Sequence, residues 1–363
     1  MVNGLYSSAV LMLVLLIAAC QWVSLAEGAR ILAVQTVGAK SHWNFMSEVL
    51  RSLTDAGHSV TVFTPFPEGD RENYTEVDMS KEFSMKTDLN LEWIIEIFSR
   101  PVTYFYMLTV RDSMYCDAVY RNRKFDKLVH GDGDDSGRKF DLIIMEPRSL
   151  DCTSYLANAL NLPIIYTIPT PMKTVSERSF TGHVSNPASI SHITSLHAVP
   201  KTFVQRFANA ALLVYSTLRT KYDGWIMKIT YPKRYQLSPK VNPAVIFLNS
   251  HYITEASRPV LPNLIEIGGI HLKPKSKIPK DILDFIDESP NGVIYFTFGS
   301  TVKLSTLPVH IEKTFKQVFT NVSQRVLWKY ESEMKDKPDN VMTKKWFPQR
   351  DVLLHPKVKL FIS

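Results

Sequence analysis

The sequence predicts an α/β protein with two domains. Residues 31–64 contain a strand, an amphipathic helix and a second strand, which is the order of a right-handed βαβ unit. A second α/β pattern follows residues 271–280, a segment rich in Pro and Lys without apolar periodicity. The length of 363 residues agrees with two domains, because one domain usually takes about 150 residues. We expect domains at 27–270 and 281–363, joined by a linker at 271–280.

The first βαβ unit follows from apolar spacing. Residues 31–36 (ILAVQT) form a short apolar run typical of a buried parallel strand. From Trp43 to Leu53 the apolar residues recur every three or four positions, which predicts a helix that ends at Gly57. Residues 60–64 are the next expected strand.

The same reasoning places the later elements. Residues 169–200, rich in Pro, Ser and Thr, predict a long surface loop. The last expected strand lies at the very end of the chain, so we expect the second domain to be incomplete. Further strands are expected at 140–145, 164–167, 244–249, 293–298, 325–328, 341–345 and 358–362, and helices at 89–98, 104–127, 152–160, 202–228, 281–288 and from 308.

Composition excludes several classes of protein. With 45% hydrophobic and 21% charged residues, the chain is neither disordered nor a coiled coil. The net charge is +7, but the basic residues are scattered, which argues against a nucleic-acid partner. The sequence has no GxGxxG, Walker A, HExxH or GxSxG motif, and we expect no metal site and no cofactor.

The amino-terminal segment has the features of a secretory signal. Residues 9–20 are apolar, no charged residue precedes Glu27, and the small residues Ser24 and Ala26 in the segment SLA (24–26) suit a cleavage site. We expect a signal peptide at 1–26, with an uncleaved signal anchor as the alternative. Entry into the secretory pathway would make Asn73 and Asn321, each in an Asn-X-Ser/Thr triplet, acceptors for glycosylation.

Two cysteines remain once the signal segment is set aside. Cys116 and Cys152 are too few for a fold held together by disulfides. Two buried thiols are the favoured interpretation, and a pairing of the two, which an oxidising compartment permits, is the alternative.

Candidate catalytic residues lie where two expected strands end. His42 follows the first strand, at the carboxyl edge where open α/β sheets build their sites, and histidine can act as a general base near neutral pH. Glu146 and Asp151 follow the strand at 140–145, and a carboxylate there would orient the imidazole. The structural alternatives are a histidine bonded to backbone at a helix end and, for Asp151, a helix cap.

The second domain carries a candidate ligand site. The strand at 293–298 ends in Gly299 and Ser300, a small-residue turn that lets a ligand approach the backbone. Trp346 and Gln349 follow another strand, and an aromatic face beside an amide suits a planar base. A core tryptophan followed by a proline that starts a helix is the alternative.

Together these segments resemble the UDP-glycosyltransferases of animals, and more particularly those of insects. The resemblance covers essentially the whole chain after the signal segment. It is clearest in SHW (41–43), FDLIIMEP (140–147), LNSH (248–251), GVIYFTFGS (292–300) and VLWKYE (326–331). The most specific string is KWFPQRDVLLHPKVKLFIS (345–363), which is similar to the opening of the nucleotide-sugar signature of the family.

The resemblance implies a GT-B architecture, in which two Rossmann-like domains face each other across a cleft. The first domain would bind the acceptor and the second the UDP-sugar. It implies that His42 deprotonates the acceptor hydroxyl for one inverting displacement, with a carboxylate partner. Asp151 fits the Asp-Cys pair of insect members and is our favoured partner, with Glu146 as the alternative. Ser300, Trp346 and Gln349 match donor contacts, with Trp346 stacking on uracil.

The resemblance leaves the substrates open. Glucose is the sugar usual in insect members, and we expect a small lipophilic acceptor. It also implies that the protein resides in the lumen of the endoplasmic reticulum and that the full-length product has a membrane anchor. Assembly into a homo- or hetero-oligomer is compatible with the resemblance. The residues expected to line the acceptor pocket are Trp43, Trp93, Phe98, Tyr104 and Phe105.

A second class of function uses the same fold. The chain ends before the glycine turn that, in the family, binds the diphosphate, so we expect these 363 residues alone to be inactive. A non-catalytic binder of hydrophobic ligands, or a truncated regulatory form, is therefore the alternative to a transferase.

Overall fold

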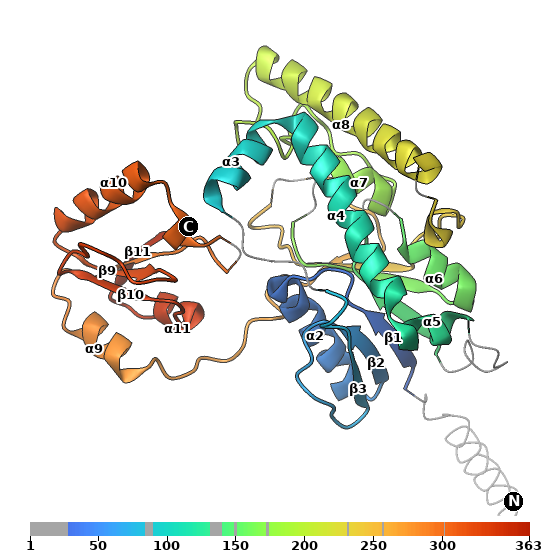
Figure 1. Cartoon of the computed structure of the whole chain (residues 1–363), viewed down its shortest axis with the longest axis horizontal. Helices are drawn as coiled ribbons and strands as arrows, with labels where there is room; N and C mark the ends of the chain where they lie inside the picture. The colour runs from blue at the N-terminus through green and yellow to red at the C-terminus, as the bar shows by residue number, and fades with distance from the viewer. Residues whose placement is uncertain are drawn as a thin grey trace, which may run out of the picture.

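The computed structural model describes residues 28–83, 90–130, 140–148, 151–171, 174–230, 232–255, 258–300 and 302–363. Two parallel β-sheets, each with its own helices, make up this part of the chain (Figure 1). The α/β class expected from the sequence is therefore confirmed. The predicted signal peptide at 1–26 lies outside the described residues.

The first sheet has seven parallel strands in the order β3-β2-β1-β4-β5-β6-β7. This is the doubly wound order in which the chain reverses direction across the sheet between β1 and β4. The strands are β1 Arg30–Val34, β2 Ser59–Thr64, β3 Tyr74–Asp78, β4 Leu142–Met145, β5 Ile164–Ile168, β6 Val245–Leu248 and β7 Leu264–Glu266.

Helices connect these strands and cover the sheet (Figure 1). They are α2 Lys40–Asp55, α3 Leu91–Ser99, α4 Pro101–Arg121, α5 Arg123–His130, α6 Thr153–Leu160, α7 Thr174–Thr181 and α8 Phe203–Thr230. The single helix expected at 104–127 is two helices. Asn122 leaves the helical conformation, and its side chain accepts hydrogen bonds from the backbone N–H groups of Lys124 and Phe125, so it caps α5.

The second sheet has four parallel strands in the order β10-β9-β8-β11. Its strands are β8 Val293–Phe296, β9 Arg325–Lys329, β10 Val341–Lys344 and β11 Val358–Ile362, and its helices are α9 Lys280–Asp287, α10 Val309–Thr320 and α11 Gln349–Leu353. Residues 267–279, without helix or strand, join the two sheets. The predicted domain limits remain a prediction.

The strands β1 and β4 are buried on both faces, which explains their continuous apolar sequences. Leu32 and Ile143 belong to one apolar cluster, and Ile31 and Ile144 belong to another. Because the apolar runs fill both sides of the sheet, the polar residues that follow them are left at its edge.

The elements that the sequence analysis missed are short or polar. Strand β3 has the sequence YTEVD, and of its side chains only Tyr74 is buried. Strand β7 has three residues and lies at the sheet edge. The expected surface loop at 169–200 contains α7, and the chain that follows α7 packs against α8 through His192, Ser195 and Asn209. The prediction of a long loop was therefore wrong in part.

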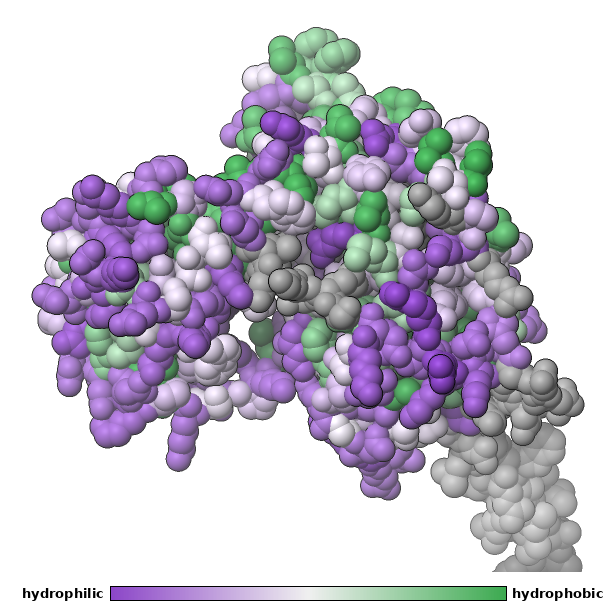
Figure 2. Space-filling model, in the orientation of Figure 1, coloured by the Kyte–Doolittle hydropathy of each residue, from purple (hydrophilic) through white to green (hydrophobic). Residues whose placement is uncertain are grey.

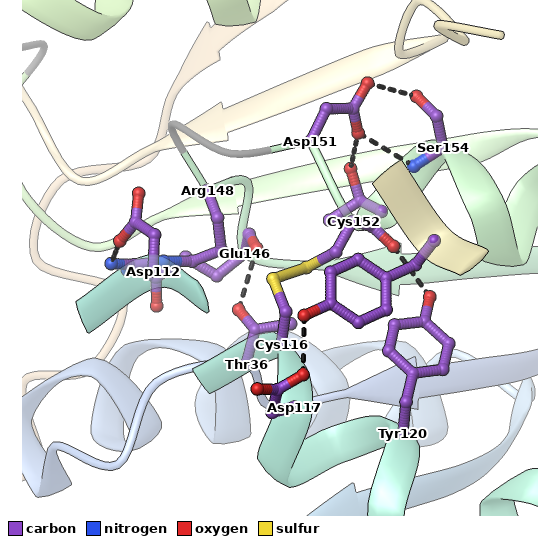
Figure 3. Close-up of a disulfide and its surroundings, with 12 residues drawn as sticks. Thr36, Asp112, Cys116, Asp117, Tyr120, Glu146, Arg148, Asp151, Cys152 and Ser154 are labelled. Atoms are coloured by element: carbon purple, nitrogen blue, oxygen red, sulfur yellow. Dashed lines mark hydrogen bonds and ion pairs between the residues drawn. A yellow bond between two sulfur atoms is a disulfide. The ribbon is translucent and has the colours of Figure 1, made fainter. Parts of the chain in front are cut away.

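A disulfide links Cys116 of α4 to Cys152, the residue before α6 (Figure 3). The favoured interpretation of two buried thiols was therefore wrong, and the alternative, a disulfide, is what the structure shows. Tyr120 donates a hydrogen bond to the carbonyl of Cys152 at 2.6 Å and stacks on Tyr235, so aromatic side chains enclose the disulfide. The two cysteines are 36 positions apart in sequence, which makes the bond a long-range restraint on the unfolded chain.

We predict that the double variant Cys116→Ala/Cys152→Ala is less stable than the oxidised protein by about 3–4 kcal/mol, because it loses this restraint. Urea unfolding measures the difference. The unmodified protein with its disulfide reduced should show a similar loss. Equal stability of the double variant and the oxidised protein would contradict the prediction.

A second prediction concerns pH. Burial lowers the pKa of His192 to about 4, below its ordinary value of 6.5. The unfolded chain therefore takes up this proton first as the pH falls, so stability decreases between about pH 6.5 and 4. From pH 7 to pH 5, we expect His192 to account for about 1–2 kcal/mol of the loss in unfolding free energy.

Urea titration at both pH values measures this loss. The variant His192→Gln should lose less stability than the unmodified protein between pH 7 and pH 5. His310→Gln, which replaces an exposed histidine on α10, should lose as much as the unmodified protein. An unchanged pH dependence in His192→Gln would refute the assignment.

Candidate functional site

The candidate site lies where β1 and β4 end, at the reversal point of the first sheet. The two strands are parallel and hydrogen-bonded, with Val34 opposite Met145, so the chain leaves both at the same edge. His42 lies in the first turn of α2, which follows β1, and Glu146 is the residue directly after β4. The doubly wound topology thus brings together two side chains that are 104 positions apart in sequence.

His42 and Glu146 form a close pair. The Nδ1 atom of His42 lies 2.8 Å from Oε1 and 3.0 Å from Oε2 of Glu146. A carboxylate only accepts hydrogen bonds, so Nδ1 donates and the lone pair of the imidazole is left on Nε2. Nε2 forms no hydrogen bond with the described part of the chain. Glu146 is buried, whereas the His42 side chain is partly exposed.

Two further contacts fix Glu146 (Figure 3). The hydroxyl of Thr36, which follows β1, donates a hydrogen bond of 2.8 Å to the Glu146 carbonyl. The guanidinium of Arg148 lies 3.8 Å from the Glu146 carboxylate and forms an ion pair with Asp112 of α4. The buried carboxylate therefore has a histidine and an arginine beside it, and that arginine is paired with a second carboxylate.

The sequence analysis missed Arg148 and Asp112. Arg148 is almost fully enclosed, and burial together with the neighbouring charge of Arg111 lowers its pKa to about 9. Its guanidinium also lies over the ring of Tyr115, 5.1 Å from the ring centroid. The available signal was an arginine three residues after the buried strand β4, since a charge at that position needs a partner.

Asp151 is not the partner of His42 in this structure. Its carboxylate accepts hydrogen bonds from the Ser154 backbone N–H at 3.0 Å and from the Ser154 hydroxyl at 2.6 Å, and the Thr153 hydroxyl donates a third (Figure 3). These contacts satisfy the first turn of α6, which is the helix-cap role weighed as the alternative. The favoured pairing of Asp151 with His42 is therefore corrected in favour of Glu146.

Several residues expected in an acceptor pocket are core residues. Trp43 is fully buried between α2 and the first sheet. Tyr104 and Phe105 are buried between α3, α4 and α8, and burial raises the pKa of Tyr104 to about 12. Trp93 is partly exposed on α3, and the side chain of Phe98 lies outside the described residues. Placing Trp43, Tyr104 and Phe105 in an open pocket was wrong, because helix packing covers them.

Trp346 and Gln349 line a cavity of about 530 Å³ between the two halves of the chain. Trp346 is 66% exposed, so it is not the core tryptophan considered as the alternative. The Asp351 carboxylate accepts hydrogen bonds of 2.7 Å from the backbone N–H and from the hydroxyl of Ser276, which ties α11 to the connecting segment. The other lining residues are Asn44, Ser47, Glu48, Arg51, Glu68, His271, Leu272, Lys273, Pro274, Pro348 and Arg350.

The structure does not bring all the candidate site residues together. Ser300 is exposed in the turn after β8, where Gly299 has a φ of 77°, a value that favours glycine. Neither Ser300 nor His42 lines the cavity beside Trp346. The candidates therefore lie in three places. His42 and Glu146 lie at the carboxyl edge of the first sheet, Trp346 and Gln349 line the cavity, and Ser300 follows the carboxyl end of strand β8.

The remaining expectations concern the surface and metals. Asn73 and Asn321 are exposed, in a turn before β3 and at the end of α10. Their glycosylation stays a prediction. Within the described ranges, no three His, Cys, Asp or Glu side chains gather as metal ligands.

The chain is similar in sequence to known glycosyltransferases. The family described as "UDP-glucoronosyl and UDP-glucosyl transferase" matches residues 29–363. UDP-glucosyltransferase 2 of Dactylopius coccus is 32% identical over 351 residues, an alignment that covers 94% of this chain and 67% of that protein. Human UDP-glucuronosyltransferase 2B7 is 26% identical, with coverages of 89% and 64%. The chain thus spans about two thirds of the length of these relatives.

A solved structure shares the fold. The structure of Phytolacca americana UGT2, complexed with UDP-2fluoro-glucose and pterostilbene, matches 92% of this chain and 75% of its own, with a TM-score of 0.50 and 12% identity. The two Rossmann-like sheets thus correspond to the GT-B fold of glycosyltransferases. With the family match over nearly all described residues, the chain belongs to the UDP-glycosyltransferase family.

Proposed function

We propose that the protein containing this chain transfers a hexosyl group from a UDP-sugar to a hydroxyl of a small lipophilic acceptor, with inversion and with His42 as the general base. Membership of the family supports the UDP-sugar donor. The observation that carries the mechanism is the 2.8 Å contact between His42 Nδ1 and the buried Glu146 carboxylate at the reversal point of the first sheet.

The pair suits proton abstraction from an alcohol. Because Glu146 accepts the Nδ1 hydrogen bond, Nε2 of His42 has the lone pair that takes the acceptor proton. The acceptor oxygen then forms a bond to the anomeric carbon while the bond from that carbon to the UDP oxygen breaks, and UDP leaves with the electron pair. Attack from the face opposite UDP inverts the configuration. Glu146 stabilises the imidazolium formed in this step.

Arg148 gives Glu146 a permanent positive neighbour. A buried carboxylate is costly unless it has hydrogen-bond and charge partners. The Arg148 guanidinium, 3.8 Å away, places an opposite charge beside this carboxylate, and the ion pair with Asp112 keeps the guanidinium in place. We therefore assign Glu146 and Arg148 positioning roles, and we assign the proton transfer to His42.

The cavity beside Trp346 is the proposed site for the nucleotide. The exposed indole offers a face on which uracil can stack, an interaction worth roughly 1–3 kcal/mol, and the Gln349 amide lies beside it in the cavity lining. Ser300 would contact the donor from the turn after β8. Glucose is the proposed sugar, and the acceptor is proposed to approach from the side of Trp93 on α3.

The cellular context is part of the proposal. Residues 1–26 would direct the protein to the lumen of the endoplasmic reticulum, where Cys116 and Cys152 can form the observed disulfide. Asn73 and Asn321 are exposed enough to accept glycans there. We also propose that a membrane anchor belongs to the full-length protein.

In an active form of the enzyme, His42→Ala should lower kcat for an alcohol acceptor by about 10²–10⁴-fold, the usual contribution of a general base. A more acidic phenol should lose less, because it gives up its proton more readily. Release of UDP measures the rate. His310→Ala, which removes an exposed histidine of α10, is the matched control and should keep full activity. An alcohol turned over equally well by His42→Ala excludes His42 as the base.

Glu146→Gln should lower kcat by about 10²-fold or more with little change in KM for the UDP-sugar, because an amide can donate to Nδ1 and select the wrong tautomer. Asp151→Asn, which keeps a capping side chain before α6, should stay within about twofold of the unmodified enzyme. Steady-state kinetics of both variants test the assignment. A larger loss in Asp151→Asn than in Glu146→Gln would show that Asp151 is the partner.

A further inference from the structure

The side chains of helix α8 that are fully buried are polar. Its buried side chains Asn209, Ser216 and Asp223 are spaced seven residues apart and thus lie along one face. The Asn209 side chain accepts a 2.6 Å hydrogen bond from the His192 backbone, and Ser216 lies 3.1 Å from His192 Nε2. Asp223 pairs with Arg219 at 2.8 Å. Internal contacts therefore occupy the polar positions of this face.

The opposite face of α8 is apolar and exposed. Its residues recur every three or four positions, as in a single helical stripe. We call this set the α8 stripe: Phe203, Phe207, Ala211, Val214, Leu218, Tyr222, Trp225 and Ile229. Ala211 is exposed, and the exposed fractions of the other seven residues lie between 56% and 82%. At 1.5 Å per residue the α8 stripe runs for about 39 Å.

Figure 2 shows the corresponding region of the surface. Hydrophobic atoms gather along the edge of the molecule over α8, where Figure 1 places this helix on the outside of the first domain. Leu196 and Val199, in the segment before α8, are exposed as well. A solvent-exposed apolar face of this length marks an interaction site.

The charges on α8 indicate the partner. Apart from the paired Asp223, every charged residue of the helix is basic: Arg206, Arg219, Lys221 and Lys228. At 100° per residue, Lys221 and Lys228 lie along one border of the stripe, and both are exposed. An apolar stripe with aromatic residues and a basic border is typical of a helix that lies in the interface of an anionic membrane.

A second copy of the chain fits this face less well. Packing two α8 stripes together would bring Lys221 and Lys228 of one copy near basic residues of the other, since α8 offers no exposed acidic residue. Anionic lipid headgroups complement the same border. None of the helices in the described ranges is long and apolar enough to cross a bilayer, so α8 would lie on the membrane.

We propose that α8 docks parallel to the surface of an anionic lipid bilayer, with the α8 stripe inserted among the acyl chains and Lys221 and Lys228 contacting the headgroups. This proposal does not depend on the transferase mechanism. It gives the first domain its own contact with a membrane, separate from any membrane-spanning segment.

Vesicle flotation tests the proposal with matched variants. Val214→Glu/Leu218→Glu places two charges in the α8 stripe, and Val309→Glu/Val318→Glu places two on α10. Val214 and Val318 are similarly exposed, at 59% and 51%. We expect the α8 variant, but not the α10 variant, to bind vesicles of phosphatidylcholine and phosphatidylserine at least about tenfold more weakly than the unmodified chain. Circular dichroism checks that both variants are folded.

Tryptophan quenching gives a readout specific to α8. In vesicles containing brominated acyl chains, Trp225→Phe should remove most of the lipid-dependent quenching, whereas Trp346→Phe, at a similarly exposed tryptophan, should keep it. Phosphatidylcholine alone, or high salt, should weaken binding. Equal quenching in Trp225→Phe and in the unmodified chain would overturn the proposal. So would a dimer in light scattering that Val214→Glu/Leu218→Glu converts to monomer, because the stripe would then be a contact between copies.

Discussion

The hydrogen-bonded pair of parallel strands β1 and β4 is the constraint on which the site depends. Their register places Val34 opposite Met145, so the next residues of both segments emerge at one edge of the sheet. The Thr36 hydroxyl continues this connection beyond the strands by bonding to the Glu146 carbonyl. Helix α2 then begins within a few residues of β1, and for this reason His42 and Glu146 meet.

A buried carboxylate at this edge imposes further requirements on the fold. Removing Glu146 from water is costly unless the carboxylate is hydrogen-bonded and its charge is compensated. His42 provides the hydrogen bond and Arg148 the opposite charge. Helix α4 holds the segment after β4 at two points, through the ion pair of Asp112 with Arg148 and the disulfide of Cys116 with Cys152. The packing of α4 thereby fixes the geometry of the pair of His42 and Glu146, although neither residue belongs to that helix.

Helix α8 shows how tertiary contacts alter the usual arrangement of an amphipathic helix. In α2 the buried face is mostly apolar, with Trp43, Phe45, Met46 and Leu50 packed inside. In α8 the fully buried side chains are polar, and two of them, Asn209 and Ser216, contact His192 in the segment before the helix. The residues of the α8 stripe are left outside, so this helix exposes an apolar surface to the solvent.

The sequence by itself determined most strands and helices, because apolar spacing depends on residues close together in the chain. It also placed His42 and Glu146 just beyond two buried strands, although it favoured Asp151 as the partner of His42. Only the tertiary structure decided between the two carboxylates, formed the disulfide and buried Trp43, Tyr104 and Phe105. The physical reason is that a side chain takes its partner from segments distant in sequence, and the order of strands in the sheet decides which of them come into contact.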